Sequence, residues 1–198
     1  MKTEKHPFQP FLPDGARILF LGSFPPQPHR WCMPFYYPNW INDFWRIMGI
    51  IFYGNRDRFC VPGEKRFDEA AIREFCTREG LAFYDTACEV RRLRDNASDA
   101  FLEVVQATDI PALLRQIPDC HTIVTTGEKA SGLVAEWLAC KVPAVGAFVD
   151  VPASSQVQGS PDVSGFARDL RFWRMPSTSR AYPLPLAKKA EEYRKLFP

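Results

Sequence analysis

Three short loops contain groups that could bind an anionic ligand or carry out chemistry on it. They read Gly22-Ser23-Phe24-Pro25, Thr126-Gly127 and Pro176-Ser177-Thr178-Ser179-Arg180. Backbone N–H groups at a glycine turn can stabilise an anion, and hydroxyl groups beside an arginine suit phosphate oxygens. Alone, each loop is a weak motif: the first lacks the Gly-x-Ser-x-Gly frame of a nucleophile elbow, and the second lacks the glycine-rich start of a Walker loop. Only together do the loops indicate a site.

An aromatic segment, residues 35–45, adds stacking surfaces and an amide. Tyr37 could stack on a flat ligand, with Tyr36, Trp40 and Phe24 as further candidates. The neutral amide of Asn42 could position a water molecule without a metal. Asn42 also stands where a helix N-cap belongs, and Tyr37 could be a core aromatic, so both have a structural alternative.

Four apolar runs predict the strands that position these loops. They are Ile18–Leu21, Leu81–Tyr84, His121–Thr125 and Leu170–Met175. Helices are expected from Asn42 onward, at Arg66–Arg78, at Ile110–Ile117, at Glu128–Cys140 and at Pro185–Phe197. Strands that alternate with helices predict an α/β fold, a three-layer α/β/α sandwich with a central four-stranded parallel sheet. Ligands bind outside the carboxyl ends of such strands, so the three loops should meet at one end of the sheet.

Four other segments give weaker signals. Residues 1–16 are expected to be a loose lead-in, within a single domain that spans residues 1–198. The stretch Val90–Ser98 is charged and turn-like. Residues 100–105 fit either a strand or an irregular crossover, and residues 142–165 fit a loop with or without one short strand. Asp85 follows a predicted strand and could line the site or cap a turn.

Composition limits the class of protein. The chain has 198 residues, of which 46% are hydrophobic. It contains no run of about 18 apolar residues, so we expect no transmembrane helix. The N-terminus lacks the apolar core of a signal peptide, so we expect a cytoplasmic protein. The six cysteines form no Cys-x-x-Cys pair, which predicts free thiols and argues against a zinc or iron–sulfur site.

Charge is distributed unevenly along the chain. The net charge of +2 does not by itself indicate a nucleic-acid partner. From residue 166 to the end, however, there are eight lysines and arginines against three acidic residues, and Arg91, Arg92 and Arg94 form a second basic cluster. Both clusters fit either a phosphate-binding surface or an ordinary solvated face.

The order and spacing of the loops resemble the uracil-DNA glycosylase superfamily, and most closely its hypoxanthine-DNA glycosylase branch, family 6. Members have a strand that ends Gly-Ser-x-Pro, a Tyr-Tyr-x-His-Pro-x-Asn-x-Phe-Trp loop, a glycine turn before a middle helix, and Leu-Pro-Ser-Thr-Ser-Pro before the final helix. The corresponding sequences here are Gly22-Ser23-Phe24-Pro25, residues 36–45, Thr126-Gly127 and residues 175–179. The resemblance covers roughly residues 17–197.

The resemblance implies a role for each matching residue. Asn42 would be the catalytic residue, and Tyr37 would stack on a flipped base. The base pocket would contain Gly22, Ser23, Phe24, Pro25, Tyr37, Asp85 and Thr126, and the DNA-binding loop would be Pro176, Ser177, Thr178, Ser179 and Arg180. The turn at residues 96–99 would brace the site. The family uses no cofactor and no metal, and its partner would be DNA that contains a damaged base, bound by a monomer.

The sequence also departs from the family pattern. Phe24 occupies a position that is a catalytic Asp or Asn in other branches, which fits the hypoxanthine branch, where the role moves to the later asparagine. The family's His-Pro before that asparagine is replaced by residues 39–41, its base-reading asparagine by Thr126, and its last proline by Arg180. These changes affect base specificity most directly.

Three hypotheses follow for the function. The first is a DNA glycosylase that flips a deaminated base, namely hypoxanthine, uracil or xanthine, and hydrolyses its N-glycosidic bond with water activated without a metal. The second is a non-catalytic nucleic-acid-binding module on the same fold, and the third is a hydrolase of free nucleosides. Release of base from DNA or from nucleosides distinguishes them.

Overall fold

The central sheet of the protein has five strands. The structure, a computed structural model, describes residues 3–93, 101–153 and 168–197. The sheet has the order β3-β2-β6-β8-β7. The parallel strands are β2 (Ile18–Gly22), β3 (Leu81–Asp85), β6 (Thr122–Thr125) and β8 (Leu170–Arg174), and β7 (Ala147–Val151) runs antiparallel to β8. The four parallel strands confirm the predicted sheet, and β7 is the short strand that the sequence left open.

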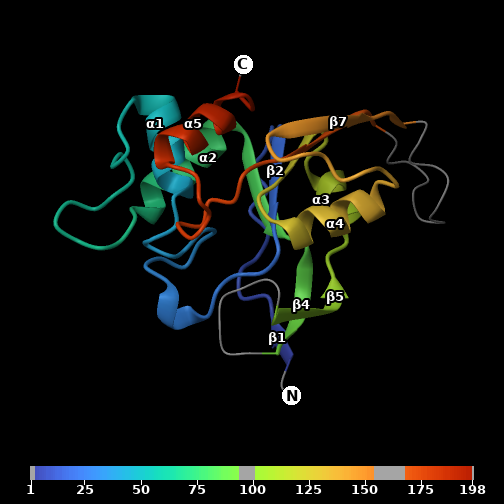
Figure 1. The fold of residues 1–198 in the computed structure, drawn as a ribbon, viewed down its shortest axis with the longest axis horizontal. Coiled ribbons are helices and arrows are strands. Elements are labelled where there is room, and N and C mark those ends of the chain that lie inside the picture. The colour runs from blue at the N-terminus through green and yellow to red at the C-terminus, as the bar shows by residue number, and fades with distance from the viewer. Residues whose placement is uncertain (1–2, 94–100, 154–167, 198) are drawn as a thin grey trace.

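Helices cover both faces of this sheet, which confirms the three-layer α/β/α architecture. In Figure 1, α1 (Phe44–Tyr53), α2 (Glu69–Glu79) and α5 (Leu186–Arg194) lie to one side of the strands, and α3 (Ile110–Gln116) and α4 (Glu128–Trp137) lie to the other. A short 3-10 helix, η1, spans Pro28–Arg30. Both α1 and α2 end at a glycine with positive φ, Gly54 at 63° and Gly80 at 67°, a conformation that glycine adopts without steric cost.

A second, antiparallel sheet corrects two expectations. It has the order β1-β4-β5, from β1 (Thr3–Lys5), β4 (Ala87–Arg92) and β5 (Leu102–Ala107). Residues 1–16 are therefore not simply a loose lead-in, and the stretch from Val90 begins in a strand rather than a turn. β4 was not predicted because its sequence is charged and contains no apolar run. Its arginines are neutralised across the sheet: Arg91 pairs with Glu103, and Arg92 pairs with Glu4. Arg94 and residues 96–99 lie outside the described residues.

An aromatic core fixes the segment that precedes α1. The rings of Phe20 and Phe83 stack at 5.3 Å between centroids, joining β2 and β3. Trp45, which is 1% exposed, donates from Nε1 to the Tyr36 carbonyl oxygen at 3.0 Å. Phe35 and Tyr36 are buried too, so residues 35–37 are held against the sheet by apolar burial.

Candidate active site

A cavity of about 1020 Å³ opens at the carboxyl ends of the parallel strands. Its walls come from the segments after β2, β3, β6 and β8, so the loops predicted to converge do converge. Of the residues predicted for the catalytic position, the base pocket and the DNA-binding loop, all but Pro176 line it: Gly22, Ser23, Phe24, Pro25, Tyr37, Asn42, Asp85, Thr126, Ser177, Thr178, Ser179 and Arg180. Pro176 is buried behind the wall, where its carbonyl oxygen accepts a hydrogen bond from Tyr193 Oη at 2.8 Å.

Asn42 lies on the cavity wall just before α1. Its Oδ1 accepts a hydrogen bond from the Phe44 backbone N–H at 2.9 Å. The sequence suggested Asn42 as the N-cap of α1, but the N-cap is Asp43. Asn42 instead forms a two-residue Asx turn. This contact fixes the amide plane. A second lone pair on Oδ1 and the two Nδ2 protons are then the groups with which Asn42 could hold a water molecule.

Two basic side chains anchor the segment that contains Asn42 and Asp43. Arg46 donates from Nη1 to the carbonyl oxygens of Trp40 at 2.8 Å and Asn42 at 3.1 Å, and its guanidinium lies 4.4 Å from the Trp40 ring centroid. Trp40 therefore packs beside Arg46 and is not a cavity residue. Lys189, from α5, donates to Asp43 Oδ2 at 2.9 Å and to the Ser179 carbonyl oxygen at 2.7 Å. The buried lysine thus ties the start of α1 to the final loop.

Tyr37 offers an aromatic wall to the cavity. Its φ is 51°, a left-handed conformation that non-glycine residues adopt only rarely. One face of the ring stacks on Phe44, with 3.9 Å between centroids and 4° between planes. Its hydroxyl lies 3.3 Å from Thr126 Oγ1. Burial raises the pKa of Tyr37, the hydrogen bond to Thr126 lowers it by less, and the phenol stays protonated at neutral pH.

Gly22 and Asp85 close the floor of the cavity. They are register partners at the carboxyl ends of β2 and β3. A Cβ atom on residue 22 would collide with Asp85 Oδ1, so only glycine leaves room for this carboxylate. The Gly22 carbonyl oxygen accepts hydrogen bonds from the Thr86 N–H at 2.8 Å and from Thr86 Oγ1 at 3.1 Å. The floor is therefore fixed on both strands.

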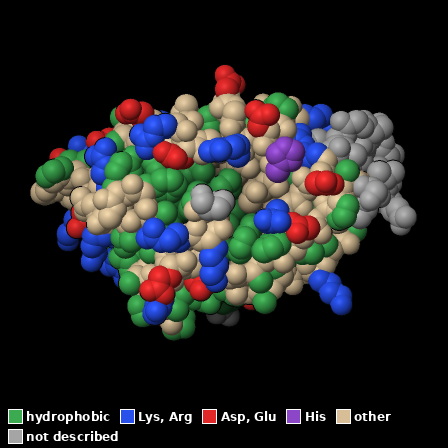
Figure 2. Space-filling view, turned by 90° about the horizontal axis from the view of Figure 1, so that it is seen from above, with side chains coloured by type: hydrophobic (Ala, Val, Ile, Leu, Met, Phe, Trp, Pro, Cys, Tyr) green, Lys and Arg blue, Asp and Glu red, His purple; other side chains and the backbone are tan. Residues whose placement is uncertain are grey.

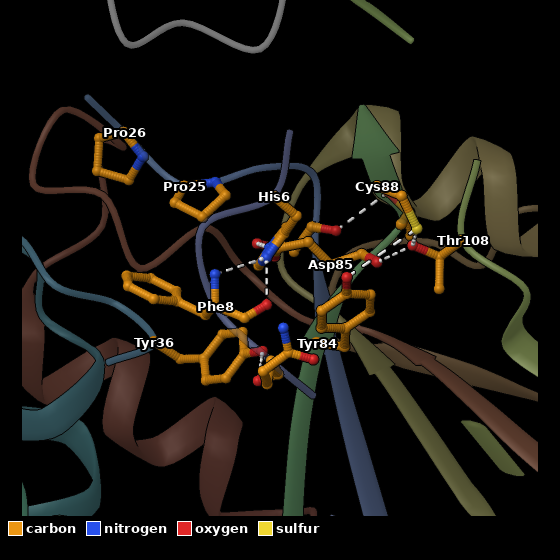
Figure 3. A network of polar contacts seen from close by, with 12 residues as sticks. His6, Phe8, Pro25, Pro26, Tyr36, Tyr84, Asp85, Cys88 and Thr108 are labelled. Atoms are coloured by element: carbon orange, nitrogen blue, oxygen red, sulfur yellow. Dashed lines mark hydrogen bonds and ion pairs between the residues drawn. The ribbon is translucent and has the colours of Figure 1, made fainter. Parts of the chain in front are cut away.

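His6 is a site residue that the sequence reasoning missed. Its Nε2 lies 2.8 Å from Asp85 Oδ2, and Figure 3 shows the imidazole against the carboxylate. The pairing of β1 with β4 brings it there, and its backbone N–H donates to the Cys88 carbonyl oxygen at 2.7 Å. No local signal could have identified it, because it is 79 residues away from Asp85 in sequence.

The final loop supplies the polar rim. Ser177 Oγ accepts from the Ser179 N–H at 3.2 Å, and Ser179 Oγ from the Ala181 N–H at 3.3 Å. Thr178 is only 2% exposed, whereas the Arg180 side chain is 54% exposed. Of the predicted phosphate-binding groups, the two serines and Arg180 are thus the accessible ones.

The cavity lining is more basic than acidic. Its charged side chains are Arg30, Lys129, Arg174, Arg180, Asp85 and Glu128. By contrast, Figure 2, which views the molecule from the top of Figure 1, shows lysines and arginines interspersed with acidic side chains. An excess of positive charge around a cavity favours an anionic ligand.

No donor set for a metal stands out: the described residues contain no group of three or more His, Cys, Asp and Glu side chains placed to hold an ion. All six cysteines are free thiols, as their spacing predicted. In the described part of the chain, none of the helices combines the length and apolar character needed to span a bilayer.

No family model and no curated protein matches this sequence. The fold is similar to the solution NMR structure of a Methanosarcina acetivorans protein described as a "putative Uracil DNA glycosylase". The two chains share 20% sequence identity with a TM-score of 0.61, over 99% of this chain and 97% of the other. At this identity the likeness shows the fold alone.

Proposed function

We propose that the protein is a DNA glycosylase that removes a deaminated base, namely hypoxanthine, uracil or xanthine. One observation carries the proposal: loops after β2, β6 and β8 meet Tyr37 and Asn42 around a single cavity. These are the segments that resemble the hypoxanthine-DNA glycosylase branch. The description of the structurally similar archaeal protein is consistent with the same chemistry.

In the proposed reaction the damaged base leaves the duplex and enters the cavity. Unstacking costs a few kcal/mol, and stacking on an aromatic ring returns about 1–3 kcal/mol. Tyr37 would supply that ring. Ser177, Ser179 and Arg180 would bind the phosphates beside the flipped nucleotide. At about 1020 Å³, the cavity is large enough for a nucleotide.

Cleavage of the glycosidic bond develops positive charge on the sugar and negative charge on the base. Asn42 would orient the attacking water through its fixed amide. Backbone N–H groups of the turn after Gly22 would stabilise the departing base as an anion. The protein would act as a single-domain monomer, in the cytoplasm, without a cofactor.

A lesion panel tests the proposal. Labelled duplexes that carry uracil, hypoxanthine or xanthine are incubated with excess folded protein and treated with alkali, which breaks the strand at an abasic site. We expect strand breaks with at least one lesion and a rate about 100-fold lower or more in Asn42→Ala, the range of positioned catalytic groups. Intact strands with all three lesions contradict the proposal.

Asn55→Ala is a matched control for Asn42→Ala. Asn55 Oδ1 accepts from the Asp57 N–H at 2.9 Å, the same two-residue contact, but Asn55 is exposed beyond the other end of α1. Its substitution should leave cleavage unchanged. Thr126, which stands where the family has its base-reading asparagine, motivates one alternative, a module that binds nucleic acid without cleaving it. Salt-dependent DNA binding that is equal in wild type and Asn42→Ala, without strand breaks, would support that alternative.

A further inference from the structure

Asp43, the residue that follows Asn42, joins the start of α1 to the final loop. Its backbone N–H donates to the Thr178 carbonyl oxygen at 2.9 Å. Its side chain is 8% exposed, and Asp43 does not line the cavity, whereas Asn42 does. The joint between the two segments therefore lies behind the cavity wall, one residue away from the amide that the proposed reaction uses.

The two carboxylate oxygens of Asp43 face two cations that differ in exposure. On one side, Lys189 Nζ lies 2.9 Å from Oδ2, and the lysine side chain is 1% exposed. On the other side, Arg180 Nη2 lies 3.6 Å from Oδ1, and the arginine side chain is 54% exposed. Because 3.6 Å exceeds the length of a hydrogen bond, this ion pair leaves the N–H donors of Arg180 to other acceptors. Lys189 is thus the fixed partner of the carboxylate, and Arg180 is the partner that a ligand in the cavity can reach.

Positive charge exceeds negative charge around this carboxylate. Lys189 and Arg180 face it directly, and the buried guanidinium of Arg46 adds a third cation. Burial lowers the pKa of Arg46, and the charge of Arg180 lowers it further, so these two guanidinium groups are close enough to repel each other. An anion bound by Arg180 reduces this repulsion and completes an array of alternating charges that runs from Lys189 through Asp43 and Arg180 to the anion.

We propose that Asp43 is a positioning residue that couples the binding of a DNA phosphate by Arg180 to the orientation of Asn42. This inference rests on the proposed function. The phosphate orders Arg180 on the exposed side of the carboxylate, which holds the final loop against Asp43 and strengthens the hydrogen bond from the Asp43 N–H to Thr178. The Asn42 amide is then held most firmly when a phosphate is bound. A phosphate beside the lesion therefore raises the rate of cleavage as well as the affinity for DNA.

Single-turnover cleavage of a lesion duplex separates these two effects. With protein in excess over labelled DNA, the protein concentration at half-saturation gives the affinity, and the plateau gives the rate of cleavage. Arg180→Met removes the phosphate contact. We expect this variant to bind more weakly and also to have a plateau rate about 10-fold lower, within the range of coupled sites.

The double variant Asp43→Asn/Lys189→Met removes the carboxylate without leaving a buried charge unpaired. In this background Arg180→Met should again weaken the affinity, but it should change the plateau rate by no more than about twofold, as for uncoupled groups. If Asp43 only stabilises the fold, Arg180→Met will lower the plateau rate by the same factor in both backgrounds, and that result overturns the inference.

Lys188→Met/Glu191→Gln is the matched control background, because it removes an exposed ion pair from the same helix. Surface pairs of this kind contribute little, so Arg180→Met should still lower the plateau rate about 10-fold in this background. A loss of the Arg180 effect here as well would show that the effect does not depend on Asp43, and it would also overturn the inference.

Hydrogen exchange of the Asp43 backbone amide, measured by NMR, tests the coupling without cleavage. The ligand is a saturating duplex that carries tetrahydrofuran, a stable abasic analogue. We expect this DNA to slow exchange about 10-fold more in wild type than in Arg180→Met, because only wild type binds a phosphate next to the bond between Asp43 and Thr178. DNA that merely covers the loop slows exchange equally in the two proteins, and equal slowing overturns the inference.

The outcomes distinguish this inference from the proposed function. If no lesion is cleaved but DNA slows Asp43 exchange through Arg180, the glycosylase proposal fails and the coupling between phosphate and Asp43 stands. If lesions are cleaved but Arg180→Met acts equally in both backgrounds, this inference fails alone. A duplex that does not slow exchange in wild type overturns it too. Circular dichroism of each variant confirms that the proteins compared are folded.

Discussion

Replacement of Lys189 by methionine should destabilise the protein strongly and loosen the site. Lys189 and Asp43 are 1% and 8% exposed in their side chains, with Nζ 2.9 Å from Oδ2. Methionine has a similar length but leaves the Asp43 charge buried without its main partner. Removal of one member of a buried pair costs about 3–5 kcal/mol. Arg180 lies 3.6 Å from Asp43 but is half exposed, so we expect the lower end, about 3 kcal/mol in the free energy of unfolding.

Equilibrium unfolding in urea measures this loss, and Lys188→Met is the matched control. Lys188 is the preceding residue of the same helix and pairs with Glu191, but both side chains are more than half exposed. Such surface pairs contribute about 0–1 kcal/mol. The double variant Asp43→Asn/Lys189→Met should be more stable than Lys189→Met, because no charge is left unpaired. Equal stability of Lys189→Met and Lys188→Met would refute the reasoning, as would a double variant less stable than the single one.

Two further predictions concern the cavity floor and the buried thiols. Gly22→Ala should displace the Asp85 carboxylate, lower stability by about 1–3 kcal/mol and weaken base binding. Gly132→Ala, in α4 where a Cβ atom meets nothing, is the control and should raise stability by about 0.5–1 kcal/mol. Thermal unfolding measures the stability of both variants, and fluorescence anisotropy measures their affinity for a DNA duplex with a damaged base. Burial raises the pKa of the Cys120 thiol from 9.0 to about 11. Between these two pH values the folded protein keeps a proton that the unfolded chain releases. The stability contributed by the protonated thiol is therefore complete below pH 9 and is lost between pH 9 and 11. Wild type should therefore lose more stability than Cys120→Ala between pH 8 and 10.5 in urea titrations, and parallel losses in the two proteins would contradict the assignment.

The parallel sheet and the composition of the cavity wall could be predicted from local patterns. Short apolar runs that end at glycine or proline, such as Ile18–Leu21, are typical of strands buried on both faces. Glycine and Asp residues mark where helices end or begin, as Gly80 and Asp109 do. Once the strands are parallel, the loops that follow them must meet at one end of the sheet. Asn42, Tyr37 and Thr126 could thus be placed around one cavity by topology alone.

In the second sheet, β5 matches the strand that residues 100–105 left open, but β1 and β4 could not be predicted from local patterns. β4 has a charged, half-buried sequence, and its stability depends on cross-strand pairs such as Arg92 with Glu4, at 3.0 Å. β1 has only three residues, and β-structure depends more on the neighbouring strand than on intrinsic preference. A pattern within one segment contains no information about such a neighbour.

The sequence by itself determined the order of the elements, the residues of the loops and hence the wall of the cavity. Only the tertiary structure decided which charged and polar partners hold the residues of that wall in place. Lys189 reaches Asp43 across 146 residues, and His6 reaches Asp85 across 79. The physical reason is that a buried charge must find its partner in space, wherever the chain returns, while hydrophobic periodicity and turn preferences act only between near neighbours in sequence.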